Sequence, residues 1–257
     1  MGIVNITPDS FYDGGKSTSE AAILKQVEKM LKDGATFIDV GGYSSRPNAE
    51  DISVQEEIDR AIPAIELILS HFPDTLISID TFRSEVARTA VESGAAMVND
   101  ISGGDFDSKM IQTVAELQVP YIIMHMRGTP KTMTQLTDYD NITTEVIYDL
   151  SAKIREARAA GINDIIVDPG FGFAKTPRQS FELLKNLKLL QTLEAPILSG
   201  VSRKSFIYKT LQITPQEALN GTTVMNTIAI LNGSAILRVH DVKEATECIK
   251  LLQNLAM

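Results

Sequence analysis

The alternation of short apolar runs with helical patterns limits the fold of this chain more than any other feature of its sequence. Apolar runs typical of buried strands recur roughly every 30 residues, and a helical pattern follows each of them. The expected strands are residues 2–4, 37–40, 76–79, 96–98, 121–124, 165–167, 197–199 and 235–239. Strict alternation of this kind implies parallel strands. Eight such units in 257 residues match a (β/α)8 barrel, or TIM barrel, so we predict a single α/β barrel domain over residues 1–257.

An open, doubly wound sheet is the alternative arrangement of the same elements. Many such sheets bind dinucleotides through a G-x-G-x-x-G turn after the first strand, and that turn is absent from this sequence. A composition that is 44% hydrophobic and 22% charged provides a sizeable core for either fold. The barrel remains the better prediction because it uses all eight units equally.

Charge and cysteine content exclude several classes of function. The formal net charge of −9 argues against a general nucleic-acid-binding surface, so an anionic ligand would need a local cluster of cations. No apolar run is long enough to cross a membrane. The one cysteine, Cys248, has no partner for an intramolecular disulfide, which is compatible with a cytoplasmic protein. We therefore expect a cytoplasmic protein that binds small molecules.

Polar residues stand where the expected strands end. In a barrel of this type, functional groups gather at the C-terminal ends of the strands. The residues at those ends are Asn5, Asp39, Asp80, Asn99, His125, Asp168, Ser199 and Arg238, with Lys204 and His240 just beyond. Each one alone is unremarkable at a strand end, and His125 can simply pack at the rim. Together they predict a site on that rim.

The stretch V-D-P-G-F-G-F-A-K, residues 167–175, is the most informative of these strand ends. It places Asp168 at the end of a strand, followed by a glycine-rich turn that contains Phe171 and Phe173. A carboxylate can accept two parallel N–H bonds, and aromatic rings beside it suit a flat, nitrogen-rich ring. The stretch by itself is also compatible with an ordinary strand-to-helix connection.

The other polar residues separate by chemistry. Asp80 and Asn99 add hydrogen-bonding groups for a heterocycle, whereas a set of basic residues favours a phosphate group. That basic set is Lys204, Arg46, Arg238 and His240. Asn5, Asp9 and Asp13 stand in one loop. Their oxygen atoms could hold Mg²⁺, which often needs only one or two protein ligands beside phosphate oxygens. The Asp13-Gly14-Gly15 sequence could instead be only a turn. Two long loops, residues 5–18 and 41–52, are expected to act as lids.

Eight motifs in order give the chain a resemblance to a known family. They are N-I-T-P-D-S-F-Y-D-G-G (5–15), G-G-Y-S-S-R-P (41–47), I-D-T-F (79–82), N-D-I-S-G-G (99–104), M-H-M-R-G-T-P (124–130), D-P-G-F-G-F (168–173), S-R-K-S-F (202–206) and R-V-H-D-V (238–242). In this set the chain closely resembles the dihydropteroate synthases, the folate-pathway enzymes blocked by sulfonamides. The resemblance covers essentially the whole chain.

The resemblance implies a reaction and a set of site residues. Members of the family join 6-hydroxymethyl-7,8-dihydropterin diphosphate to p-aminobenzoate with release of pyrophosphate, and they are commonly homodimers that use Mg²⁺. By resemblance, Asp80, Asn99, Asp168 and Lys204 bind the pterin, Asn5 binds Mg²⁺, and Arg238 and His240 bind the diphosphate. Ser45 and Arg46 belong to the second loop, and Phe173, Lys204 and Ser205 lie against p-aminobenzoate. Catalytic roles fall to Asp80, Lys204, Arg46 and Asp13.

Three departures from the family pattern carry expectations of their own. Ser45 stands where the family usually has threonine, which keeps the hydroxyl group and loses a methyl group. Ala174 stands where the family usually has glycine, which matters only if that position has a positive φ. Residues that often precede the first strand are absent from this sequence, so we expect weaker closure at the bottom of the barrel.

Two other functions compete with the synthase. A related pterin-binding barrel transfers a methyl group from methyltetrahydrofolate to a corrinoid, and it would share the pterin-binding acids without needing the anion-binding groups. A pterin-binding relative without turnover would have lost Asn5, Lys204 or Arg238, and all three are present. Pyrophosphate release that depends on both substrates would separate the three possibilities.

Overall fold

The computed structural model describes residues 1–6, 16–44 and 51–255. Its strands are β1 (Gly2–Asn5), β2 (Phe37–Gly41), β3 (Leu76–Asp80), β4 (Met97–Asp100), β5 (Tyr121–Met124), β6 (Ile165–Asp168), β7 (Ile197–Ser199) and β8 (Ser234–Leu237). Its α-helices are α2 (Lys16–Lys32), α3 (Val54–His71), α4 (Ser84–Glu92), α5 (Met110–Leu117), α6 (Ile142–Ala159), α7 (Pro177–Lys185), α8 (Ser205–Leu211), α9 (Leu219–Leu231) and α10 (Val242–Leu255). Two 3-10 helices, η1 (Met133–Gln135) and η2 (Leu187–Leu193), complete the described elements.

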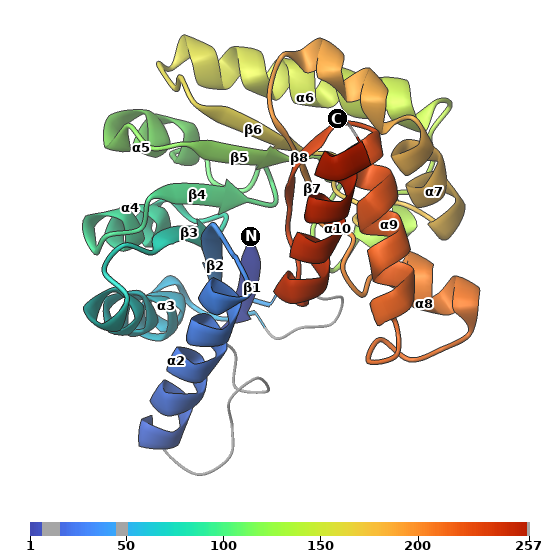
Figure 1. Ribbon diagram of the computed structural model, residues 1–257. Coiled ribbons are helices and arrows are strands. Elements are labelled where there is room, and N and C mark those ends of the chain that lie inside the picture. Colours follow the sequence, from blue (N-terminus) through green and yellow to red (C-terminus); the bar gives the residue numbers. More distant parts are fainter. Residues whose placement is uncertain (7–15, 45–50, 256–257) are drawn as a thin grey trace.

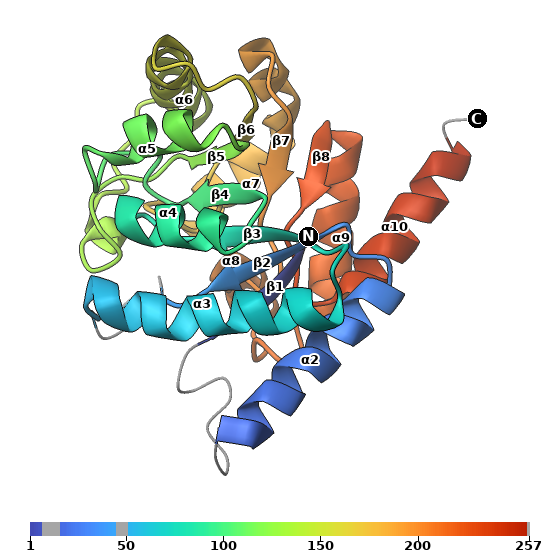
Figure 2. The same ribbon diagram turned by 90° about the vertical axis from the view of Figure 1, so that its left-hand side faces the viewer.

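The strands form one parallel sheet whose spatial order is the sequence order, β1 to β8. The sheet closes on itself, because Gly2 bridges Val239 in a parallel pairing. The N–H of Ile3 donates to the carbonyl of Val239 over 3.0 Å, and the N–H of Val239 donates to the carbonyl of Met1 over 2.9 Å. The closure that the sequence put in doubt is therefore present. Helices surround the strands on the outside (Figure 1, Figure 2). The prediction of a barrel is therefore confirmed, and the alternative of an open sheet is wrong.

The inside of the barrel has an apolar lower part and a polar upper part. Because side chains alternate along a strand, every second residue points inward. The lower inward positions form a small buried cluster, made of Met1, Met97, Ile122, Ile166 and Leu198. The next inward positions along β2, β4 and β6 are Asp39, Asn99 and Asp168, all buried. The sheet therefore packs its base with apolar side chains and holds its polar residues toward the C-terminal ends of the strands.

The outward side chains of the strands pack against the helices in one large apolar core. Local signals in the sequence set several helix ends. Thr176 and Gln179 form a reciprocal capping box at the start of α7, and Pro177 occupies its first turn. Helix α3 continues through Pro63, and α2 already begins at Lys16, before the expected end of the first loop. Within the described ranges, no helix is long and apolar enough to cross a membrane.

Candidate functional site

The turn after β6 presents Asp168 at the upper end of the barrel. The N–H of Gly170 donates to Oδ1 of Asp168 over 2.7 Å, which fixes the carboxylate. Gly170 has φ +69°, and a Cβ at this position would come within 2.1 Å of the carbonyl oxygen of His125. Only glycine fits so close an approach. The D-P-G sequence therefore serves to hold the Asp168 carboxylate in a fixed direction.

Ala174 adopts the conformation that makes its departure from the family pattern matter. Its φ is 48°, in the left-handed region that favours glycine. The side chain is buried, and its methyl group belongs to a small apolar cluster with Ile101, Met124, Met126 and Met133. The alanine therefore combines backbone strain with buried apolar contact.

Lys175 holds the same turn in place through contacts with His125 and Phe173. Its buried Nζ lies 2.8 Å from Nδ1 of His125 and 2.9 Å from the carbonyl oxygen of Phe173. Burial and the neighbouring Lys175 lower the pKa of His125 to about 2, so this imidazole is neutral and accepts the hydrogen bond from Nζ of Lys175. Burial also lowers the pKa of Lys175 well below its ordinary value. His125 packs at the rim as expected, and it joins the end of β5 to the turn that carries Phe173.

Three side chains from β2, β3 and β4 and one from the residue after β8 form a continuous polar network at the top of the barrel. Nε of Arg238 donates to Oδ2 of Asp39 over 2.6 Å, and its Nη2 donates to Oδ2 of Asp80 over 2.5 Å. Nδ2 of Asn99 donates to the same Oδ2 of Asp39 over 3.1 Å. Arg238 was predicted to bind an anion, and here it is paired with two carboxylates.

Asn99 is held by the turn that follows it. Asp100 points to the opposite side of β4, where it accepts hydrogen bonds of 2.7 Å from the N–H of Ser102 and from the hydroxyl of Tyr121. The N–H of Gly104 adds a third, at 2.8 Å. In the N-D-I-S-G-G motif, Asn99 therefore faces the barrel interior, and Asp100 holds the end of β4 in place.

Lys204 lies between the Asp168 carboxylate and an aromatic ring. Its Nζ donates to the carbonyl oxygen of Phe171 and lies 4.7 Å from the centre of the Phe173 ring. Gly200 leaves open the space beside them, since a Cβ there would be 3.8 Å from both Oδ2 of Asp168 and Nζ of Lys204. The structure therefore brings Asp168, Phe173 and Lys204 together, as the sequence predicted.

Burial tunes the charges of these groups. It raises the pKa of Asp80 to about 7, against the opposing effect of the Arg238 guanidinium. It also raises the pKa of Asp168, which the Lys204 ammonium and the Gly170 N–H oppose. Burial lowers the pKa of Lys204 to about 8, although Asp168 opposes this change. For Arg238 the carboxylates of Asp39 and Asp80 outweigh burial and raise its pKa. Acids and cations with shifted pKa values in one place are typical of functional sites.

The two cations of the S-R-K sequence point to different places. Arg203 leaves the site and forms a two-pronged ion pair with Asp241, at 2.8 and 2.9 Å. The neighbouring Ser202 accepts the N–H of His240 over 3.2 Å, and its hydroxyl oxygen lies 3.1 Å from Nδ1 of that histidine. The loops after β7 and β8 are therefore joined, and only Lys204 of the two cations faces Asp168.

The other predicted residues vary in how well they are placed. Asn5 ends β1 in register with Gly41, whose own Cβ position lies 3.4 Å from Cβ of Asp80, so Asn5 stands beside the network. Ser205 is the first residue of α8, directly after Lys204.

Ser199 is buried and alternates with the inward Leu198, so its side chain faces away from the interior. Asp13, Ser45 and Arg46 lie outside the described residues, as do most of the two expected lid loops.

Sequence reasoning placed Asp39 at a strand end without giving it a function, and it gave Lys175 none. Both are polar, buried and bonded to predicted site residues or to the turn that carries them. A charged residue within an apolar strand pattern, such as Asp39 in F-I-D-V, is the signal that could have identified the first. Lys175 carries no comparable signal, because a lysine after a turn is usually exposed.

Comparisons with known proteins agree with this geometry. Residues 1–240 match the family described as "Pterin binding enzyme". Dihydropteroate synthase from Synechocystis is 46% identical over 98% of this chain and 88% of its own length. Folic acid synthesis protein fol1 from Schizosaccharomyces pombe is 47% identical over 97% of this chain, which spans only 35% of that longer protein.

A solved structure gives the same result for the fold. Dihydropteroate synthase from Xanthomonas albilineans, solved with 4-aminobenzoic acid, superposes with a TM-score of 0.92 at 37% identity, covering 99% of this chain and 92% of that one. The similar proteins are synthases or folate-synthesis proteins, which favours the synthase over the methyltransferase. This chain belongs to the dihydropteroate synthase family of pterin-binding barrels, which are transferases of folate biosynthesis.

Proposed function

We propose that this chain condenses 6-hydroxymethyl-7,8-dihydropterin diphosphate with p-aminobenzoate to give 7,8-dihydropteroate and pyrophosphate. The proposal rests on one observation: hydrogen-bonding groups and cations lie together on the same rim of the barrel. Asp80, Asn99 and Asp168 supply hydrogen-bonding groups for a heterocycle, and Arg238 and Lys204 supply cations beside them. A related protein that only bound pterin would have no use for the second set.

The pterin lies against the acids and the amide. Asp168, held by the N–H of Gly170, accepts adjacent N–H groups of the ring edge. Nδ2 of Asn99 already donates to Asp39, which leaves its carbonyl oxygen to accept from the ring. Lys204 approaches the ring from the side of Phe171. The pterin thus replaces solvent in a site whose polar groups are already oriented.

The diphosphate takes over part of the bonding of Arg238. Nη2 of Arg238 pairs with the Asp80 carboxylate. A phosphate oxygen replaces this carboxylate as the partner of Nη2, and His240 adds a donor from the loop after β8. The exchange frees the Asp80 carboxylate, which then faces the pterin methylene group.

Bond breaking and bond making follow in two steps. The methylene C–O bond breaks, and both electrons leave with pyrophosphate, whose negative charge Arg238 and His240 stabilise. The positive charge left on the methylene spreads into the pterin ring, next to the ionised Asp80. The nitrogen of p-aminobenzoate attacks the methylene, a C–N bond forms, and the nitrogen loses a proton to solvent. No strong base is needed, because the arylamine is neutral at pH 7.

The second substrate binds beside Lys204. The ring of Phe173 and the start of α8 at Ser205 border the space next to Nζ of Lys204, which suits a flat ring with a carboxylate. The related X. albilineans enzyme holds 4-aminobenzoic acid. Sulfonamides share the arylamine part of this substrate, so we place their inhibition at the same position.

Magnesium fits the donors of the site only together with the substrate. Among the residues that the structure describes, no group of three His, Cys, Asp or Glu side chains could hold a metal ion. Asn5 offers one hard oxygen donor beside Asp80, and Mg²⁺ commonly binds through one or two protein oxygens plus phosphate oxygens. Asn5 would hold the ion, which would neutralise charge on the diphosphate.

The experiment that tests the function measures pyrophosphate release by the purified protein. Release should require the pterin diphosphate and p-aminobenzoate together, and each alone should give only background. EDTA should lower the rate, and added Mg²⁺ should restore it. Release that continues without p-aminobenzoate would indicate hydrolysis, and no release in any mixture would leave only pterin binding.

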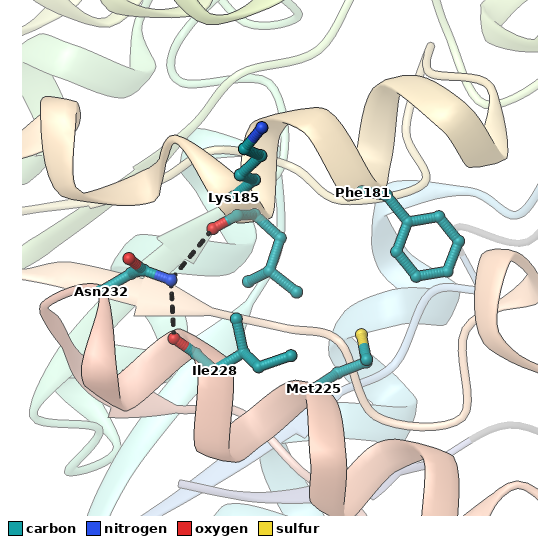
Figure 3. A pocket seen from close by; sticks show the side chains of 6 residues that line it. Phe181, Lys185, Met225, Ile228 and Asn232 are labelled. Atoms are coloured by element: carbon teal, nitrogen blue, oxygen red, sulfur yellow. Dashed lines mark hydrogen bonds between the residues drawn. The ribbon is translucent and has the colours of Figure 1, made fainter.

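We further propose that the protein is a homodimer that pairs through α7 and α9. Helix α9 turns small or polar residues inward, including Gly221, Thr222 and Asn226, and leaves apolar ones outside. Val224 and Leu231 are 46% and 66% exposed. Between α7 and α9 lies an open hollow of about 400 Å³, bordered by Phe181 and Met225 (Figure 3). A second copy of the chain would cover these apolar side chains.

Light scattering coupled to gel filtration tests the homodimer. The wild-type chain should run at twice its monomer mass, and Leu231→Asp should shift it to the monomer. Leu251→Asp is the matched control, because Leu251 is 70% exposed on α10. A wild-type monomer, or a dimer that only Leu251→Asp disrupts, would place the interface elsewhere or remove it.

A cytoplasmic location is also part of the proposal. It is supported by the single cysteine, Cys248, which is buried and free, and by substrates that are made and used in metabolism.

A further inference from the structure

Asp39 is the point where the polar network of the barrel branches. Its side chain is completely buried within β2. One of its oxygens, Oδ2, accepts from both Nε of Arg238 and Nδ2 of Asn99, at 2.6 and 3.1 Å. Its neighbour in register on β3 is Ser78, whose hydroxyl has no hydrogen-bond partner in the part of the chain that the structure describes. The small serine lets Asp39 reach across β3 to Asn99 on β4.

We propose that Asp39 is a positioning residue that joins the pterin subsite to the diphosphate subsite. Asn99 belongs to the first and Arg238 to the second, and a single buried carboxylate holds both. The inference rests on the proposed function, and it gives a role to the one acid of the network that touches neither substrate.

The carboxylate fixes the direction of the Asn99 amide. A carboxylate only accepts hydrogen bonds, so the amide must turn its NH₂ group toward Asp39. The carbonyl oxygen of Asn99 therefore faces the other way and presents an acceptor to the pterin. With a neutral amide at position 39, both orientations of Asn99 become possible, and the pterin must select one of them.

The Asp39 carboxylate also determines which nitrogen atom of Arg238 is available to a ligand. Asp39 holds Nε, so that Nη2 can change its partner from Asp80 to a phosphate oxygen while the guanidinium keeps its place. Without the negative charge of Asp39, the full attraction of Arg238 falls on Asp80. The diphosphate then competes with a stronger ion pair, and Asp80 is less free to face the methylene cation.

The substitution that tests this is Asp39→Asn, which keeps the shape and removes the charge, with Ser78→Ala as the matched control on the neighbouring strand. We expect Asp39→Asn to weaken the binding of a pterin without phosphate and the binding of pyrophosphate, each by tenfold or more in calorimetric titration. The kcat should fall by a similar factor, and Ser78→Ala should stay within twofold of wild type for all three. Unchanged affinity for either ligand, with only a lower Tm, would show that Asp39 is structural.

A measurement on the wild-type protein covers the case in which Asp39→Asn does not fold. The side-chain amide resonance of Asn99, assigned by its loss in Asn99→Ala, should shift when pyrophosphate alone is added. The shift is expected because Arg238 changes partner while Asp39 bonds both residues. A resonance unmoved at saturating pyrophosphate would overturn the coupling. Ligand binding and this shift do not require turnover, so a failure of the proposed reaction would be seen separately.

Discussion

The lower and upper parts of the barrel interior are formed by the same strands, but the lower part is apolar and the upper part is polar and charged. Met97 lies below Asn99 on β4, and Ile166 lies below Asp168 on β6. The lower set packs as an apolar cluster, which stabilises the fold through burial of apolar surface. The upper set is held by charge-assisted bonds among Asp39, Asp80, Asn99 and Arg238. One strand thus carries a stabilising residue and a binding residue two positions apart.

A substitution should therefore have a different effect in each part of the barrel interior. Truncation of an apolar side chain in the lower part leaves a cavity, and its effect falls on the stability of the whole barrel. Loss of a charge in the upper part leaves a partner unsatisfied, and its effect falls on ligand binding. The following experiments compare the two parts on the same strands.

The largest effect is expected from Met97→Ala, in the lower part of β4. Met97 is 4% exposed, so its truncation should lower the free energy of unfolding by about 2–5 kcal/mol. Denaturant unfolding measures this change, and titration with a pterin should show nearly wild-type affinity in the folded fraction. A large loss of pterin affinity, equal to that of Asn99→Ala, would mean that the two parts are not separable.

The next effect is expected from Asp168→Asn, at the upper end of β6. The amide would present an NH₂ group to the N–H donors of the pterin, and leaving such groups unpaired costs about 1–3 kcal/mol. Pterin affinity should therefore fall by roughly one to two orders of magnitude. The control is Asp164→Asn, an exposed acid just before the lower end of the same strand, which should bind pterin normally. Equal affinity in both variants would remove Asp168 from the site.

A smaller and graded effect is expected from pH. Asp80 must be ionised to stabilise the methylene cation, and burial raises its pKa to about 7. Lys204 must be protonated, and burial lowers its pKa to about 8. As pH falls below the first value or rises above the second, kcat/KM should fall about tenfold per pH unit, giving a narrow bell. Asp80→Asn should remove the acid limb from any residual activity, and a flat profile from pH 5 to 9 would contradict these assignments.

Much of the barrel was predictable because its periodic pattern repeats eight times. Each strand needs apolar side chains on its outer face, so β1 to β8 are visible in the sequence. The hydrogen-bond partners of individual polar side chains were not predictable in this way. Glu57 lies in α3, in a polar stretch that predicts exposure, yet it is completely buried. There it accepts from the hydroxyl of Thr81 over 2.7 Å and from Nη1 of Arg83 over 2.9 Å.

The site was predictable to the extent that strand ends converge in any parallel barrel. Asp80, Asn99, Asp168 and Lys204 meet because of topology alone. The outward direction of Ser199 follows from alternation along β7. The partners of the long charged side chains were not predictable, since they depend on contacts between residues far apart in sequence. Arg203 is drawn away by Asp241, and Arg238 is held by Asp39, which is 199 positions earlier.

The smallest effect concerns Ala174, where strain and packing meet in one residue. Its φ of 48° carries a left-handed strain of roughly 1–2 kcal/mol for an alanine, which Ala174→Gly would relieve. The same change removes a buried methyl group, worth about 0.8 kcal/mol, and adds about 0.4–1 kcal/mol of unfolded-state entropy. These contributions nearly cancel, so Ala174→Gly should change the free energy of unfolding by less than about 1 kcal/mol.

The matched control for Ala174→Gly removes the contribution of packing. Gly161 has φ +98°, and a Cβ added there would meet nothing within 4 Å. Gly161→Ala therefore gains no packing. Its strain of roughly 1–2 kcal/mol is partly offset by about 0.4–1 kcal/mol of unfolded-state entropy, so it should lower the unfolding free energy by at most about 1.6 kcal/mol. If Ala174→Gly stabilises the protein by well over 1 kcal/mol, the methyl group contributes little to its cluster. If it destabilises the protein by 2 kcal/mol or more, packing around the turn outweighs the strain, and the turn after β6 then depends on apolar contact like the lower part of the barrel.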